Sequence, residues 1–231
     1  MTRAANDEPL RWPILAFSAL ALTALVAPFG AMLFLADGAS KGANELFSGP
    51  ILALGMMGAG MIGGAITGRF AIGVGLAALI GLAIILTASL AVTPGFPFSA
   101  SFAPVVLLAS ISFAARGALF ARSGGGKGWW IALFVVLGEA AIIITAATMP
   151  GTLPDWLLSL LPAQWASMEG QSAAASGSGV RWISAPLIAL GATAAATLFV
   201  VSLWPRKWTY SVMFTTWLAA SALVYNSPAI F

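Results

Sequence analysis

The chain has 231 residues, of which 60% are hydrophobic and 7% are charged, and its formal net charge is +3. Globular proteins carry about 25% charged residues, so these few charges cannot cover a water-facing surface of this size. The composition excludes a cytosolic enzyme and a disordered tail, and the absence of a Lys/Arg stripe excludes a nucleic-acid-binding module. The sequence therefore predicts an all-α, polytopic helix bundle whose main partner is the lipid bilayer.

The chain also contains no Cys and no His. Disulfides, thiol nucleophiles, His-ligated haem or copper and Ser-His-Asp relays are therefore excluded. Only seven carboxylates are present, mostly in predicted short loops, and such a set does not build an oxygen-ligated metal site. The expectation is a protein that is not an enzyme and that has no cofactor and no metal.

A membrane helix needs about 20 predominantly apolar residues, and seven stretches of the sequence are close to this length. The first is longer than the about 7 to 15 residues of a signal-peptide core and contains Pro28, so we interpret it as a retained span with a kink. The predicted spans are residues 12–35, 50–68, 70–92, 102–121, 129–149, 182–203 and 208–225.

The basic residues give these spans an orientation, because Lys and Arg concentrate in cytoplasmic loops. The inner side receives Arg3, Arg11, Arg69, Arg122, Lys127, Arg206 and Lys207, and the outer side Lys41 and Arg181. A six-span alternative with a re-entrant loop would disturb this asymmetry. We expect a cytoplasmic tail (1–11), one transmembrane domain (12–231) with an outer-side loop (150–181), and an external C-terminus, in a bacterial-type inner membrane.

The loops differ in character. Residues 67–69 predict a tight hairpin, and residues 122–128 a flexible basic loop. Within the long outer connection, residues 153–165 are apolar but too short to span, so they are expected along the outer membrane surface or against a partner. Residues 171–179 are rich in Ser, Ala and Gly, which favours a flexible tether.

A Ser–Pro signature precedes three inward-running spans. It reads Ser48-Gly49-Pro50 and Ser184-Ala185-Pro186, with a looser copy from Ser101 to Pro104. Ser caps helices and Pro is tolerated in a first turn. The pattern is consistent either with three duplicated hairpins or with a shared requirement for a helix start.

Small residues recur at intervals of four in the second and third spans, a spacing that lets helices approach closely in lipid. Three uses stay open: packing within the chain, an interface with another subunit, and a smooth wall along a path for an apolar substrate. The helix-packing candidates are Gly55, Gly60, Gly64, Gly68, Gly73 and Gly81.

Two charged residues, Arg116 and Glu139, fall inside predicted spans on the two arms of one antiparallel hairpin. Side chains lean towards the helix N-terminus, so these two converge, and an isolated charge in a bilayer is costly; we predict an intramembrane ion pair. The alternatives are an Arg116 that reaches the inner headgroups and a neutral Glu139 bonded to Ser112 or to a backbone carbonyl. The pair could act as a structural clasp, a substrate or proton site, or a contact with a partner.

A seven-span chain invites comparison with retinal proteins, but every Lys lies in a predicted loop, so no Schiff base can form within a span. These residues do not resemble the motifs of a known family. The leading hypothesis is a non-enzymatic accessory or structural subunit of a larger inner-membrane complex, with other membrane subunits bound through small-residue helix faces. The alternative is a small transporter or channel for an apolar or lipid-like solute.

Overall fold

The computed structural model describes residues 8–36, 41–92, 100–175 and 183–227, and across these residues every regular element is helical. The elements are α1 (Glu8–Ala21), η1 (Leu22–Val26), α2 (Ala27–Ala36), α3 (Lys41–Met57), η2 (Gly58–Ile62), α4 (Gly63–Thr67), α5 (Phe70–Thr87), η3 (Ala88–Val92), η4 (Ala100–Phe102), α6 (Ala103–Gly124), η5 (Gly125–Lys127), α7 (Gly128–Thr148), α8 (Asp155–Ser159), α9 (Pro162–Ala175), α10 (Ala185–Ser202) and α11 (Trp208–Tyr225). The predicted all-α class is confirmed for this part of the chain.

Among the described residues, 5 helical segments are long and apolar enough to cross a membrane. One of them joins α6 and α7 through η5, and α11 is not in this set. The segments are Trp12–Phe34, Ser48–Thr67, Phe70–Leu90, Ala103–Thr148 and Ala185–Ser202. A membrane-embedded helical protein follows from these segments, whereas the number of seven spans and their orientation stay predictions.

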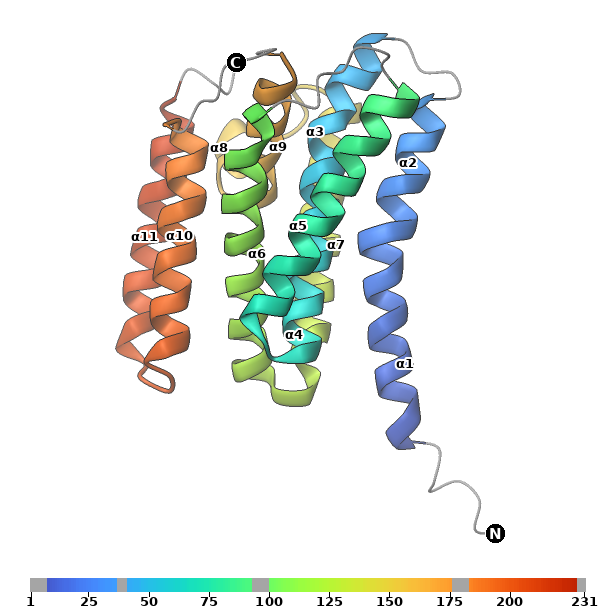
Figure 1. Ribbon diagram of the computed structural model, residues 1–231. Coiled ribbons are helices and arrows are strands. Elements are labelled where there is room, and N and C mark those ends of the chain that lie inside the picture. The colour runs from blue at the N-terminus through green and yellow to red at the C-terminus, as the bar shows by residue number, and fades with distance from the viewer. Residues whose placement is uncertain (1–7, 37–40, 93–99, 176–182, 228–231) are drawn as a thin grey trace.

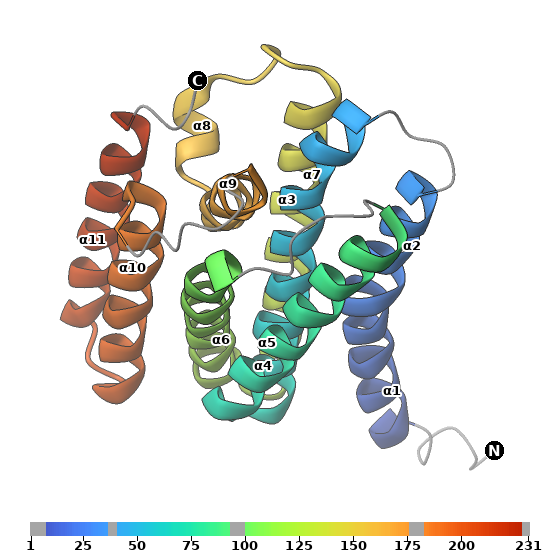
Figure 2. The same ribbon diagram turned by 45° about the horizontal axis from the view of Figure 1, so that its top comes forward.

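The long helices stand side by side in a bundle (Figure 1). The α1–α2 rod lies on one side, the α10–α11 hairpin lies on the other, and α3 to α7 fill the space between them (Figures 1 and 2). The turns α4–α5, α6–α7 and α10–α11 lie at the same end of the bundle (Figure 1). The basic residues of those turns, Arg69, Arg122, Lys127, Arg206 and Lys207, therefore gather at one end.

The first rod changes its helical geometry beside Pro28. A proline ring clashes with the carbonyl four residues earlier and removes a backbone donor. That carbonyl belongs to Ala24, which lies in the π-helical turn η1. The wider turn accommodates Pro28 at the start of α2, so the rod passes the proline without ending.

Close packing at the centre of the bundle depends on glycines from three helices. A Cβ atom built on Gly117 of α6 would lie 2.5 Å from the Met61 carbonyl oxygen, and one on Gly73 of α5 would lie 2.9 Å from that of Gly60. Both obstacles are backbone atoms of η2, which cannot rotate away. Glycine at these positions lets α5 and α6 approach η2 at backbone distance.

The other glycines singled out in the sequence divide into two groups. Gly55 packs against Ile84 and Pro28, Gly64 against α6, and Gly81 against Met56. Gly68 has no atom within 4 Å of its virtual Cβ; it ends α4 with φ of 64°, a left-handed conformation that glycine adopts without strain. Gly68 therefore makes the predicted tight hairpin and does not serve as a packing residue. The small-residue faces around Gly60 are occupied within this chain.

The segment predicted to lie on the outer surface enters the bundle. Trp165 of α9 is 0% exposed, whereas Trp156 of α8 is 58% exposed, so only the first part of residues 153–165 fits the prediction. Helix α9 lies in the middle of the bundle and contacts α3, α10 and α6 (Figure 2). Burial against these helices overrides the surface preference that the sequence pattern suggested.

Three smaller expectations also need correction. The loop predicted at 122–128 is mostly helical, because α6 continues to Gly124 and η5 leads directly into α7. The second span begins earlier than predicted, since α3 starts at Lys41 and passes through Pro50. Helix α9 extends to Ala175, so the tether begins later than expected, and residues 176–179 lie outside the described residues. Of the Ser–Pro signatures, Ser184 caps its helix by accepting from the Leu187 N–H at 3.3 Å.

Candidate functional site

Glu139 lies near the middle of the bundle. At about 1.5 Å per residue, α7 is about 32 Å long, and Glu139 lies about 16 Å along it from its first residue, Gly128. Its side chain is 8% exposed, and its Oε2 atom accepts a hydrogen bond from the backbone N–H of Ala163 at 3.0 Å. Ala163 lies in the first turn of α9, where N–H groups have no helical partner. The carboxyl group therefore caps a helix that begins inside the bundle.

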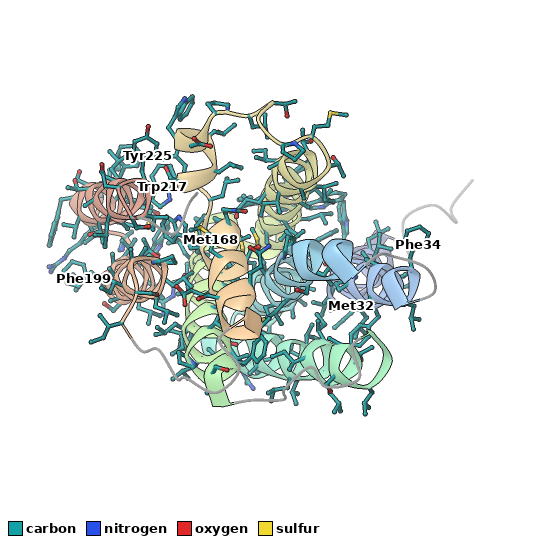
Figure 3. The ribbon with its side chains drawn as sticks, turned by 90° about the horizontal axis from the view of Figure 1, so that it is seen from above. Met32, Phe34, Met168, Phe199, Trp217 and Tyr225 are labelled. Carbon is teal, nitrogen blue, oxygen red and sulfur yellow. The ribbon has the colours of Figure 1, made fainter. Side chains whose placement is uncertain are left out.

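The turn between α8 and α9 brings backbone polar groups to this depth, where water is scarce and each group needs a partner. Two tryptophans supply donors. The indole N–H of Trp165 donates to the Ser159 carbonyl oxygen at 2.8 Å, and that of Trp217 on α11 donates to the Leu160 carbonyl oxygen at 3.1 Å. The turn is therefore held from two sides, by Glu139 on α7 and by Trp217 on α11. Trp217 is labelled in Figure 3.

Arg116 comes from α6, on the other arm of the hairpin. Its guanidinium carbon lies 6.0 Å from the centroid of the Phe113 ring, at the outer limit of a cation–π contact. Its Nη1 atom is enclosed and has no hydrogen-bond partner. The hydrogen bond that Glu139 accepts comes from α9, and none of the hydrogen bonds of the described residues reaches Nη1 of Arg116. The direct ion pair between Arg116 and Glu139 stays a prediction.

Ser112 lies one turn before Arg116 on the same face of α6. Its side chain is 0% exposed, and its Oγ atom has no hydrogen-bond partner. The alternative in which Ser112 holds Glu139 is therefore wrong, since the hydrogen bond that Glu139 accepts comes from the α9 backbone. Two unsatisfied buried polar atoms on one helix face are unusual, because protein interiors pair nearly all such atoms.

A cavity of about 190 Å³ lies between α6, α10 and α11, beside Arg116. Its hydroxyl-bearing residues, Thr193 and Thr197, donate to carbonyl oxygens of their own helix at 2.7 Å. Their oxygen atoms retain lone pairs but no spare proton. The full lining is Arg116, Leu119, Phe120, Thr193, Thr197, Met213, Phe214 and Trp217.

The cavity has two ends. Met213 and Phe120 lie nearer the end of the bundle with the basic turns, while Trp217 lies about one turn further along α11. Trp217 also contacts the α8–α9 turn through its indole N–H. The α8–α9 segment therefore borders one end of the cavity, and Arg116 lines its wall.

A second hollow, which we call the lateral groove, lies along α7, the helix that carries Glu139. It measures about 360 Å³ and is bounded by α1–α2, α3 and α7. Its lining is apolar apart from Thr23, whose hydroxyl donates to the Ala19 carbonyl oxygen at 2.8 Å. The remaining residues are Ala27, Pro28, Ala31, Phe34, Pro50, Ile51, Leu54, Val136, Leu137, Ala140, Ile144 and Ala147. Phe34 is 80% exposed at the rim (Figure 3).

No group of three or more His, Cys, Asp or Glu residues that could hold a metal ion occurs in the described part of the chain. No protein-family model matches the sequence, and neither a characterised protein nor a solved structure shows significant similarity to it. The functional argument therefore depends on the site geometry.

Sequence reasoning located Arg116 and Glu139 but missed the element between α7 and α10 that completes the site. Trp217 joins α11 to this element through the hydrogen bond from its indole N–H to the Leu160 carbonyl oxygen. The available signal was Leu161-Pro162 followed by Trp165 in an apolar segment too short to span, which is typical of a turn that starts a short helix.

Proposed function

We propose that this chain is a non-enzymatic transport protein, a small transporter or channel that passes a small, largely apolar solute across a bacterial-type inner membrane. The observation that carries the proposal is the α8–α9 segment. It begins a helix inside the bundle, next to a cavity lined by the intramembrane Arg116. Transporters place substrate sites near the bilayer midplane at such interrupted helices, and irregular backbone at this depth is tolerated where it lines a cavity.

The proposal includes seven transmembrane helices, with the N-terminus in the cytoplasm and the C-terminus outside. It is supported by the basic turns at one end of the bundle, since Lys and Arg favour the cytoplasmic side. In this orientation the cavity extends from the midplane towards the cytoplasm. The α8–α9 segment would then separate it from the outer side, and transport requires this segment or α11 to move.

Cysteine accessibility tests the proposal without knowledge of the solute, because the chain has no native Cys. Thr197→Cys places a thiol in the cavity wall. We expect a charged methanethiosulfonate to label it from the cytoplasmic side and, in a slower reaction, from the outer side. Ser110→Cys is the matched control, since Ser110 is 0% exposed and outside the cavity lining; it should stay unlabelled. A Thr197→Cys protein that neither side labels would refute a solute path.

The accessory-subunit hypothesis is the second candidate, and the lateral groove favours it. An apolar groove between α2, α3 and α7 is suited to a helix of another membrane subunit, which would have to bind outside the glycine faces already occupied within this chain. Extraction in a mild detergent tests this idea. A stoichiometric complex with other proteins is expected if it is right, and a monodisperse single species would count against it.

A further inference from the structure

We infer that the cavity between α6, α10 and α11 takes a small organic anion, a carboxylate with a short apolar part, and that Arg116 is the residue that recognises its charge. This inference rests on the proposed function and specifies the substrate class of the same site. It depends on three features of the cavity: the unmatched donor on Arg116, the chemistry of the other walls, and the available volume.

The first feature is the state of Arg116. Its Nη1 atom is buried without a hydrogen-bond partner, and its nearest aromatic contact, Phe113, offers no lone pair. Glu139 is the nearby carboxyl group; it accepts the N–H of Ala163, and Nη1 of Arg116 has no hydrogen bond to it. The guanidinium group is a rigid fork of donors that matches a carboxylate in geometry and charge. A bound anion would supply the acceptor that the protein does not supply.

The second feature is the rest of the lining. The hydroxyl groups of Thr193 and Thr197 donate to their own helix, so they add no donor that would select a strongly hydrated ion. The other walls are apolar or aromatic, from Leu119, Phe120, Met213, Phe214 and Trp217. One cationic group in an otherwise apolar wall is suited to an amphipathic anion, whose apolar part covers the rings while its charge meets Arg116.

The third feature is size. Ligand cavities for drug-sized molecules measure about 300 to 1,000 Å³, so a cavity of about 190 Å³ takes something smaller. Since each water occupies about 30 Å³ of the liquid, the space corresponds to about six waters. A space of this size accommodates a short-chain or single-ring acid.

Binding to the purified full-length protein tests the inference with three probes, acetate, butyrate and benzoate, each paired with its uncharged amide. The unmodified protein by itself distinguishes an anion site from a site for neutral solutes, because each acid and its amide match in shape. We expect at least one acid to bind at least tenfold more tightly than its amide, as expected for hydrogen bonds to a charged group. If no acid binds more tightly than its amide, the assignment of an anion site is overturned.

Variants then test the role of Arg116. Arg116→Gln should weaken binding of the preferred acid by about tenfold to a hundredfold, and Arg116→Lys by less, because Lys keeps the charge and loses the fork. Arg69→Gln is the matched control, since Arg69 lies in the α4–α5 turn outside the cavity; it should bind as the unmodified protein does. An acid preference that survives Arg116→Gln would overturn the role of this residue.

The outcome is separable from that of the proposed function. If Thr197→Cys is labelled from both sides but acids and amides bind alike, the path stands and the substrate class is wrong. If acids bind through Arg116 but Thr197→Cys is labelled from neither side, the site binds an anion without passing it, and transport is wrong.

Discussion

The close approach of α6 to η2 predicts the effect of adding one methyl group at Gly117. A Cβ there would lie 2.5 Å from the Met61 carbonyl oxygen and 2.8 Å from that of Gly60. Since both are backbone atoms, Gly117→Ala must push α6 away from η2. Overpacking of this kind costs about 1 to 3 kcal/mol, and the absence of a movable side chain favours the upper part of that range.

A methyl group at a helical glycine also has a favourable effect, because alanine is a better helix former by about 1 kcal/mol. Gly75→Ala in α5 isolates this term, since no atom lies within 4 Å of the virtual Cβ of Gly75. The packing penalty is therefore the difference in the free energy of unfolding between Gly75→Ala and Gly117→Ala. For a chain of this size, about 1 to 3 kcal/mol corresponds to a Tm difference of about 2 to 12 °C.

The measurement is the temperature at which half of the detergent-purified protein is no longer monodisperse. Gly75→Ala should match or exceed the unmodified protein, and Gly117→Ala should lie below Gly75→Ala by the amount stated. If the two variants shift Tm by the same amount, the backbone contact between α6 and η2 is not formed as described. The small-residue faces would then be available for contacts with another subunit.

Three further predictions concern the α8–α9 segment and the orientation. Trp165→Phe leaves the buried Ser159 carbonyl oxygen without its donor and should lower the free energy of unfolding by about 1 to 3 kcal/mol in the same thermal assay. The same substitution at the exposed Trp156 should change it by no more than about 0.5 kcal/mol. Equal effects would contradict the burial of α9. Glu139→Gln keeps an oxygen acceptor for the first turn of α9, whereas Glu139→Leu removes it. Glu139→Leu should therefore lower the free energy of unfolding by about 1 to 3 kcal/mol more than Glu139→Gln does. Equal losses in the two variants would mean that this hydrogen bond does not hold the helix. A membrane-impermeant maleimide should label Thr152→Cys in intact spheroplasts and Gly126→Cys only after the spheroplasts are permeabilised. The reverse pattern would show that the orientation is inverted.

The membrane class and the extents of most long helices follow from local sequence patterns. The stretch predicted at 70–92 coincides with α5 and η3, and the one at 129–149 differs from α7 by one residue at each end. These properties are local, because the length of an apolar run and the turn residues beside it are enough to define a membrane helix. The hairpin at Gly68 was predictable for the same reason.

The depth of α9 was decided only by the tertiary structure. Its 14 residues include Gln, Ser and Glu, a composition that resembles a surface helix. What draws it into the bundle is the set of partners around its first turn, Glu139 from α7 and Trp217 from α11, which lie far away in sequence. No local pattern shows that these groups meet a particular backbone atom.

The same distinction applies to the two intramembrane charges. Their presence on one hairpin was evident from the sequence, and so was the cost of burying them. Which acceptor each side chain meets depends on the rotation of each helix and on what packs beside it. The carboxyl group of Glu139 caps α9, and Arg116 lines a cavity between helices that no local sequence pattern brings together. Local chemistry thus determined where the charges are, and helix packing decided what they face.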